Sequence, residues 1–298
     1  MPFKTPVTFD CTNARPDLLA AFPYLQILRE SPTFAALADD LDGWQMLGAD
    51  LDDIAYQIDM ASHTIRLNTR GLASSSILRS QYFRNNLAFA ALCAVRAAWA
   101  ARAESHARSM HRPDTWPLIG RMVRADTAAM AVRMGYELLD IHEGEILWRH
   151  TLGDALGDVA LEYARAVENL PEGTDDDAAL GAAFMAWLGR PERLHVSDAQ
   201  ILAEMDMGLP ALAWDGRGKL SEGALRCLSV DPLDGDSYLG HYAGIIAGDP
   251  AQADMVDPIN QAHFLQIMEE IGTTRVAGIS MRDSALAKRL FPGLLEKA

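Results

Sequence analysis

The chain has 298 residues, of which 49% are hydrophobic and 22% are charged, and its formal net charge is −15 at pH 7. This is the composition of a folded globular protein with enough residues for one large domain or two ordinary ones, so a disordered or fibrous chain is excluded. The negative charge argues against nucleic acids and anionic membranes as partners, because both select for basic surfaces.

The cysteines and the start of the chain predict a cytoplasmic location. Met1 is followed by Pro-Phe-Lys-Thr-Pro, without the apolar run of a signal peptide. The most apolar stretch, residues 87–101, is too short to span a bilayer and contains Arg96. Cys11, Cys93 and Cys227 lie far apart and form no CxxC pair, as in proteins of a reducing compartment.

The N-terminal third is expected to contain short helices followed by a β-hairpin. Prolines at positions 16, 23 and 32 divide the first 50 residues, which we interpret as short helices. Residues 54–68 then alternate apolar and polar side chains around a polar centre. This pattern predicts antiparallel strands at Tyr56–Met60 and Thr64–Leu67, with Ala61-Ser62-His63 in or beside the turn.

Two long helices are expected in the middle of the chain. The first runs from about Ile77 to about Ser109, with Ser74-Ser75-Ser76 as its cap, and the second from about Trp116 to Asp140. The expected core face of the second helix consists of Ile119, Met122, Val123, Ala129, Met130, Met134 and Leu138.

The rest of the chain is also expected to be mainly helical. Further helices are predicted at Leu152–Leu170, Asp177–Leu188, His195–Met205, Gln261–Ile271 and Asp283–Leu290. Glycine and proline become denser after about Gly208. We therefore expect a mainly helical domain at residues 1–207, with a small hairpin, and a helical subdomain at residues 208–298 packed on it. The fold class is mainly α with a small β component.

The apolar segment Leu87–Ala101 contains one polar side chain, that of Arg96. A helix that is apolar on all sides is buried on most of them, and a buried guanidinium needs a partner. Asp126 is similarly isolated in the second long helix. We predict that Arg96 and Asp126 form a buried bidentate salt bridge. The alternative is that Arg96 extends to solvent at the helix edge.

Residues 71–150 are the only net positive part of the chain, with ten arginines, no lysine and seven acidic residues. Arginine suits bidentate pairing with carboxylate or phosphate. One interpretation is that these arginines pair with the acidic flanks of the same chain. The other is that they hold an acidic substrate.

The usual catalytic motifs are absent from the sequence. There is no H-E-x-x-H, G-x-S-x-G, G-x-G-x-x-G or Walker A pattern. His106 and His111 are weak candidates for metal ligands, because five residues place them about 140° apart around a helix. Cys93 lies among alanines, where a thiol is usually inert packing.

Several segments resemble a bacterial family of unknown function described as zincin-like metallopeptidases. They are His63-Thr-Ile-Arg-Leu-Asn, Arg79-Ser-Gln-Tyr-Phe-Arg-Asn-Asn-Leu, Arg124-Ala-Asp126, Tyr136-Glu-Leu138 and Ala182-Ala-Phe-Met-Ala-Trp187. The resemblance covers roughly residues 50–190. It implies a zincin-like helical core, in which a hairpin precedes a helix bearing H-E-x-R-H-x-W and a second helix carries E-A-D.

The same resemblance implies that the catalytic positions have changed. Aligning Arg96 and Trp99 with the family motif puts Cys93 and Ala97 where histidines would be, Ala94 in place of the glutamate and Arg124 in place of the third ligand. An arginine would repel a metal, and one cysteine does not make a zinc site.

We therefore expect a pseudoenzyme without a cofactor that binds a protein or peptide partner, and neither nucleic acid nor membrane. The alternative is a hydrolase, metallopeptidase-like or other, that uses the arginine-rich segment to hold an acidic substrate. Zinc is expected only in that case.

Overall fold

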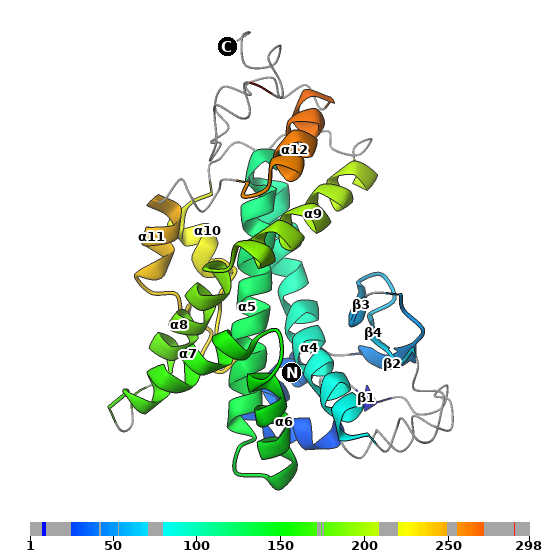
Figure 1. The fold of residues 1–298 in the computed structure, drawn as a ribbon, viewed down its shortest axis with the longest axis vertical. Helices are drawn as coiled ribbons and strands as arrows, with labels where there is room; N and C mark the ends of the chain where they lie inside the picture. Colours follow the sequence, from blue (N-terminus) through cyan, green and yellow to red (C-terminus); the bar gives the residue numbers. More distant parts are fainter. Residues whose placement is uncertain are drawn as a thin grey trace. The chain divides into compact units, whose positions relative to one another are not determined.

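The computed structural model describes residues 8–9, 25–41, 43–52, 54–70, 80–171, 174, 176–208, 220–248, 255–270 and 289. Within this part the fold is mainly α-helical with one small sheet, as predicted (Figure 1). No helix of these residues is both long and apolar enough to cross a membrane.

The chain forms two compact units, each assembled from segments that are separated in sequence. The first, here called the sheet unit, comprises Met1–Arg102, Asp126–Ala186 and Val230–Tyr238. The second, here called the helical unit, comprises Ala103–Ala125, Trp187–Ser229 and Leu239–Ala298. The expected division near residue 208 adjoins residues 209–219, which lie outside the described part of the chain, and it stays a prediction.

The sheet unit contains a four-stranded sheet with the order β1-β2-β4-β3. β1 (Thr8–Phe9), β2 (Gln45–Ala49) and β4 (Thr64–Asn68) run parallel, whereas β3 (Tyr56–Asp59) pairs antiparallel with β4 at the edge. The hairpin predicted from the sequence is thus confirmed. His63 in its turn has a φ of 49°, a left-handed conformation that few side chains adopt.

Residues 45–49 were expected to be helical, and this prediction is wrong. The segment Gln-Met-Leu-Gly-Ala shows little alternation, but it becomes strand β2 by pairing in register with β4. Such pairing between distant segments leaves no local pattern. The helix before it, α2 (Pro32–Asp40), begins at a proline whose missing N–H costs nothing at that position, and the Ser31 hydroxyl caps the helix by accepting from the amide of Phe34.

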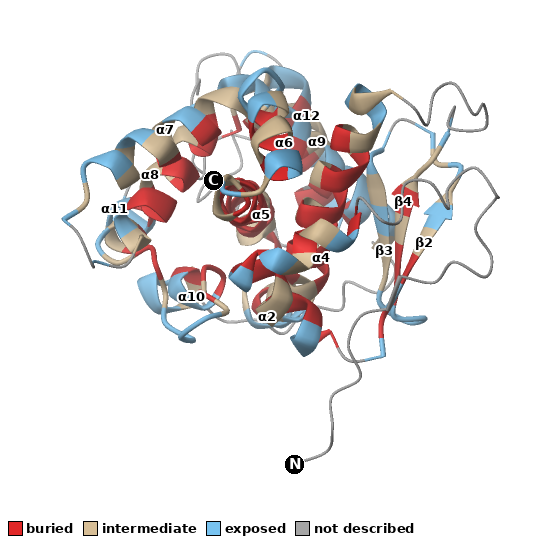
Figure 2. Ribbon diagram, turned by 90° about the horizontal axis from the view of Figure 1, so that it is seen from below, coloured by how far each residue is buried: buried red, intermediate tan, exposed pale blue. Residues whose placement is uncertain are grey.

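The two long helices are α4 (Gln81–Met110) and α5 (Trp116–Glu137), joined through the 3₁₀ turn η3 (Pro113–Thr115). Both agree with the predicted segments, although α5 ends before Asp140 and the predicted cap at residues 74–76 lies outside the described residues. All the expected core residues of α5 are buried. In Figure 2 buried positions cover much of α4 and α5, as their apolar sequences predict.

The other helices of the sheet unit are α6 (His142–Leu152), α7 (Gly157–Glu168) and α8 (Asp177–Leu188), of which the last residues belong to the helical unit. α8 matches its prediction. α6 was not predicted, and the helix expected at Leu152–Leu170 begins only at Gly157. Gly144 lies in the first turn of α6, where an added Cβ would be 1.9 Å from the carbonyl oxygen of Leu138. Only glycine fits this approach.

The helical unit contains α9 (Pro191–Gly208), α10 (Glu222–Cys227), α11 (Tyr242–Gly248) and α12 (Pro258–Glu270). α9 and α12 include most of the helices predicted at His195–Met205 and Gln261–Ile271, and the helix predicted at Asp283–Leu290 falls outside the described residues except for position 289. One buried apolar cluster consists of Ile201, Leu202, Met205, Met255, Phe264, Ile267 and Met268.

Candidate functional site

The predicted pair of Arg96 and Asp126 is present and fully buried. Arg96 Nε and Nη2 donate to the two carboxylate oxygens of Asp126, each at 2.7 Å, and neither side chain is exposed to solvent. Bidentate geometry of this kind is the strongest contact between arginine and carboxylate. The alternative, an arginine that extends to solvent, is wrong.

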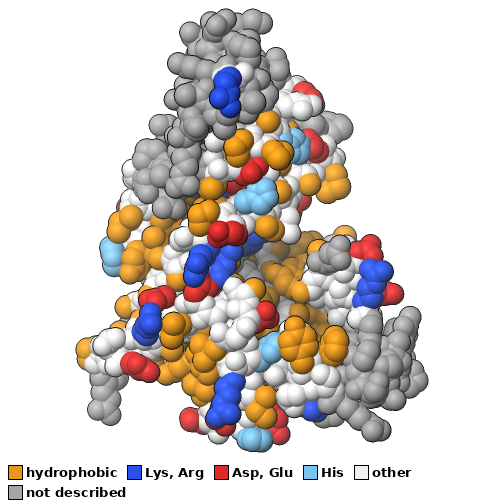
Figure 3. Space-filling model, viewed as in Figure 1, with side chains coloured by type: hydrophobic (Ala, Val, Ile, Leu, Met, Phe, Trp, Pro, Cys, Tyr) orange, Lys and Arg blue, Asp and Glu red, His pale blue; other side chains and the backbone are white. Residues whose placement is uncertain are grey.

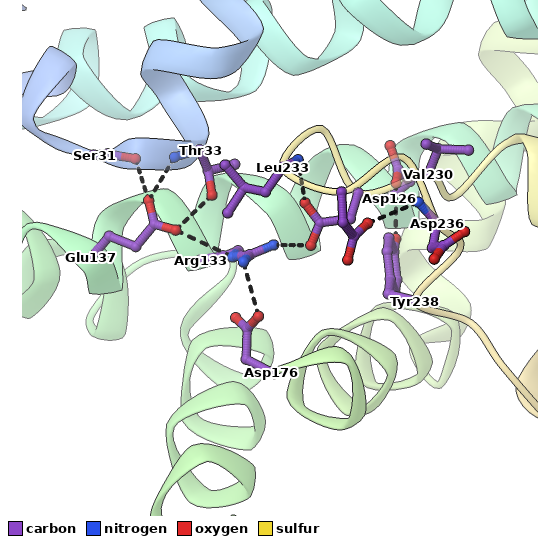
Figure 4. A network of polar contacts seen from close by, with 12 residues as sticks. Ser31, Thr33, Asp126, Arg133, Glu137, Asp176, Val230, Leu233, Asp236 and Tyr238 are labelled. Atoms are coloured by element: carbon purple, nitrogen blue, oxygen red, sulfur yellow. Dashed lines mark hydrogen bonds and ion pairs between the residues drawn. The ribbon is translucent and has the colours of Figure 1, made fainter. Parts of the chain in front are cut away.

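Three further groups contact this pair. Arg96 Nη2 also donates to the carbonyl oxygen of Val230 at 2.8 Å. The Tyr238 hydroxyl donates to Asp126 Oδ1 at 2.8 Å (Figure 4). The guanidinium lies 4.5 Å from the ring centroid of Trp99. The first and last residues of the segment Val230–Tyr238 therefore both contact the pair.

Burial and the contact between the two charges act together on the pKa values of these groups. It raises the pKa of Tyr238 well above its usual value, so the phenol stays protonated and acts as a donor. Burial acts to lower the pKa of Arg96, but the contact with Asp126 outweighs this effect and the pKa is raised. The guanidinium therefore remains charged. Burial raises the pKa of Asp126, whereas its contact with Arg96 acts in the opposite direction. Both carboxylate oxygens of Asp126 accept from the guanidinium, so the pair holds α4 to α5.

A second polar cluster of the sheet unit surrounds Arg133 on α5 (Figure 4). Its guanidinium pairs with Asp231, with Asp176 at 3.0 Å and with Glu137 at 3.2 Å. Burial of Arg133 acts to lower its pKa, but the three carboxylates more than offset this effect and raise it. The Tyr163 hydroxyl donates to Asp176.

The cluster continues to the start of α2. The hydroxyls of Ser31 and Thr33 and the amide of Thr33 all donate to the carboxylate of Glu137. Figure 4 shows Arg133 between this carboxylate and Asp176. A carboxylate at a helix N-terminus also interacts favourably with the helix dipole. The cluster thus fastens α2 to α5.

Sequence reasoning missed this cluster, although a signal was present. Arg133 stands in the run Ala-Met-Ala-Val-Arg-Met, so it is as isolated among apolar residues as Arg96. The same argument about a buried guanidinium would have required acidic partners for it. One partner, Glu137, lies four residues further along the same helix, where an i,i+4 pair is a local signal. The other two, Asp176 and Asp231, lie far away in sequence, and nothing local identifies them.

Most arginines of the arginine-rich segment pair with carboxylates of the same chain. The pairs are Arg96–Asp126, Arg108–Glu104, Arg112–Asp114, Arg121–Asp198, Arg124–Glu204, Arg133–Glu137 and Arg149–Glu145. On the face drawn in Figure 3, blue basic side chains lie beside red carboxylates. Pairing with the acidic flanks is confirmed for four arginines, which contact Glu204, Asp198 or Asp176: Arg108, Arg121, Arg124 and Arg133. Arg96, Arg112 and Arg149 pair with carboxylates of the segment itself.

The positions identified by the resemblance are distributed over both units. Cys93, Ala94 and Ala97 lie on α4 in the sheet unit, and desolvation raises the pKa of the Cys93 thiol to about 12. Because of this raised pKa, the Cys93 thiol stays protonated at neutral pH, which makes it a poor metal ligand and a poor nucleophile.

Arg124 lies on α5 in the helical unit, where its Nε donates to the side-chain oxygen of Gln200 at 3.1 Å.

The weak histidine candidates show no metal geometry. His106 is exposed near the end of α4, and His111 Nδ1 lies 2.8 Å from the carbonyl oxygen of Ala107. Within the described residues, no three histidine, cysteine or carboxylate side chains are grouped closely enough to hold a metal ion.

Comparison of the chain with protein-family models finds no match, and comparisons with curated proteins and with solved structures also find none. The resemblance to zincin-like peptidases therefore stays a prediction that rests on the motifs quoted above.

Proposed function

We propose that the chain is a non-catalytic relative of zincin-like peptidases that binds an extended polypeptide segment in the cytoplasm. The order of elements supports this proposal. The hairpin of β3 and β4 precedes α4, and α5 follows, as the resemblance implies for the hairpin and the two motif-bearing helices.

The buried Arg96–Asp126 pair is the observation that carries the non-catalytic part of the proposal. Asp126 stands where the family motif on the second helix has its aspartate, and both its oxygens accept from Arg96. Alanines at positions 94 and 97 offer no ligand or base. A salt bridge with a protonated thiol one turn away on α4 does not provide the chemistry of a zinc peptidase.

The edge of the sheet supports the binding part. In the described residues, β3 pairs with β4 along one edge and with no strand along the other. The backbone N–H of Asn68 donates to the carbonyl of Ala55, and in an antiparallel pair every second residue forms such hydrogen bonds. Residues 55, 57 and 59 therefore bond to β4, and the backbone N–H and C=O of Ile58 point to the opposite edge. An extended segment can add to such an edge as a further strand.

The alternative, a hydrolase that holds an acidic substrate with the arginine-rich segment, is less favoured. Arginines of this segment that would bind the substrate pair instead with carboxylates of the same chain. A guanidinium that is buried with a carboxylate is not accessible to a substrate.

Metal analysis and a broad peptidase and esterase screen test the non-catalytic part. We expect no stoichiometric zinc and no hydrolysis. Zinc bound at one ion per chain, together with hydrolysis that a chelator abolishes, would overturn the proposal.

A pair of variants tests the binding part. Ile58→Pro removes an N–H that points away from β4, so the ladder of the hairpin is preserved, whereas Ile58→Val keeps this donor. Binding of extended peptides by the full chain should be lost in Ile58→Pro and retained in Ile58→Val. Circular dichroism and thermal unfolding would show that both variants are folded. Equal binding by a folded Ile58→Pro variant would contradict addition at this edge.

A further inference from the structure

The two faces of strand β3 differ in chemistry. Side chains alternate between the faces of a strand, and residues that pair across two strands share a face. Ile58 pairs with Ile65, so it lies on the face whose residues Ile65 and Leu67 are buried. Gln57 and Asp59 share the opposite face with Arg66, which pairs with Gln57. A strand added along the edge of β3 would place its side chains alternately on these two faces.

Apolar side chains are exposed at both ends of β3. Ile54 precedes the strand and Met60 follows it, and their side chains are 44% and 39% exposed. Apolar side chains of an added strand beside Ile58 would extend the apolar face of the sheet, and burying apolar surface is favourable. Alternate positions of the partner should therefore be apolar.

The opposite face presents a carboxylate at the edge. Asp59 Oδ1 accepts from the amides of Ala61 and Ser62, each at 3.1 Å, and hydrogen bonds from Ser62 lower the pKa of Asp59, so it is ionised at neutral pH. Arg66 approaches Oδ2 at 3.4 Å from β4, the strand farther from the edge. Asp59 thus lies between Arg66 and the place of an added strand.

We propose that the partner is an extended segment that alternates apolar with basic residues, its apolar side chains beside Ile58 and its basic side chains beside Asp59. This inference rests on the proposed strand addition at β3. A basic residue opposite Asp59 continues the alternation of charge that begins at Arg66, whereas an acidic residue places like charges side by side, which destabilises a sheet. The net charge of −15 also favours a basic partner.

The test uses the full chain and three labelled, end-blocked hexapeptides: Lys-Val, Ser-Val and Glu-Val repeats. Binding is measured by fluorescence anisotropy in about 0.15 M salt, where the Debye length is about 8 Å and long-range attraction is screened. The Lys-Val peptide should bind roughly fivefold more tightly than the Glu-Val peptide, in line with cross-strand charge pairs. A peptide of the same composition with three lysines followed by three valines should bind more weakly than the alternating one.

Two variants locate the preference. Asp59→Asn should bring the Lys-Val and Ser-Val peptides to similar affinity, whereas Asp52→Asn, which removes an exposed acid that pairs with Arg70, should leave their ratio unchanged. If Ile58→Pro abolishes binding but the charge of the peptide has no effect, or if both asparagine variants lose the preference equally, this inference fails and strand addition stands. If no peptide binds in a way that Ile58→Pro abolishes, strand addition itself fails.

Discussion

Replacing the two partners of the buried pair, singly and together, tests how Arg96 and Asp126 stabilise the sheet unit. Arg96→Met leaves the Asp126 carboxylate with the Tyr238 hydroxyl as its remaining donor, in a place without solvent. Asp126→Leu leaves the Arg96 guanidinium with the carbonyl of Val230. Each single change should lower the free energy of unfolding by about 3–5 kcal/mol, because a buried charge loses its counter-charge.

The double variant should be much more stable than the sum of the single changes predicts. It removes both charges, and it leaves unpaired only the Tyr238 hydroxyl and the Val230 carbonyl. At about 1–3 kcal/mol for each of these two groups, we expect a loss of roughly 2–6 kcal/mol instead of the 6–10 kcal/mol that additivity gives. At the middle of both ranges, the coupling energy between positions 96 and 126 is about 4 kcal/mol.

Equilibrium unfolding in urea, followed by tryptophan fluorescence and circular dichroism, measures these differences. Arg149→Met is the matched control. It removes an arginine from a pair whose side chains are 73% and 43% exposed, and it should cost no more than about 0.5 kcal/mol. Additive effects at positions 96 and 126, or a loss in Arg96→Met as small as in the control, would refute the reasoning.

Three further predictions concern single residues. In a variant with serine at positions 11 and 227, Cys93 should react with a thiol reagent at pH 8 only after unfolding, because its pKa is raised to about 12; rapid labelling of the folded chain would contradict this. Burial lowers the pKa of His150 below its ordinary value of 6.5, so its contribution to stability is present above that pH and is lost as the pH falls through the lowered value. Between pH 7 and pH 5, the free energy of unfolding in urea should therefore fall less for His150→Gln than for the native chain. An equal fall in both would speak against this prediction. Gly144→Ala should lower the free energy of unfolding by about 1–3 kcal/mol or more, and the melting temperature with it. The control Gly153→Ala should cost little, because its added Cβ would be 3.6 Å from its nearest neighbour. Similar melting temperatures for the two variants would be inconsistent with the close approach of Gly144 to Leu138.

The helices and strands that could be predicted are those that form because of residues close together in the sequence. The hairpin follows from alternation around a polar turn, and α8 begins at Asp177, an acid suited to the first turn of a helix. β2 was missed because it forms only by pairing with β4. α6 was missed because its start depends on the close approach of Gly144 to Leu138, which no periodicity reveals.

The polar residues show the same difference between local signals and contacts that join distant parts of the sequence. Arg96 and Asp126 were found because each is an isolated charge on an apolar helix, and two such charges are most simply satisfied by each other. Tyr238 and Asp231 were not found, because they are 112 and 98 residues from their partners Asp126 and Arg133. A loop residue that completes a distant buried cluster leaves no periodic signal.

The position of Val230–Tyr238 in the chain has a consequence for dissecting the protein. This short segment belongs to the sheet unit, but the residues before and after it belong to the helical unit. A fragment that ends at residue 207 would contain Arg96, Asp126 and Arg133 but would lack Asp231 and Tyr238, so charged groups of its core would have lost partners. No single cut in the chain yields either unit whole. The sheet unit would have to be obtained by joining its three segments, or by adding the missing segment as a peptide in trans.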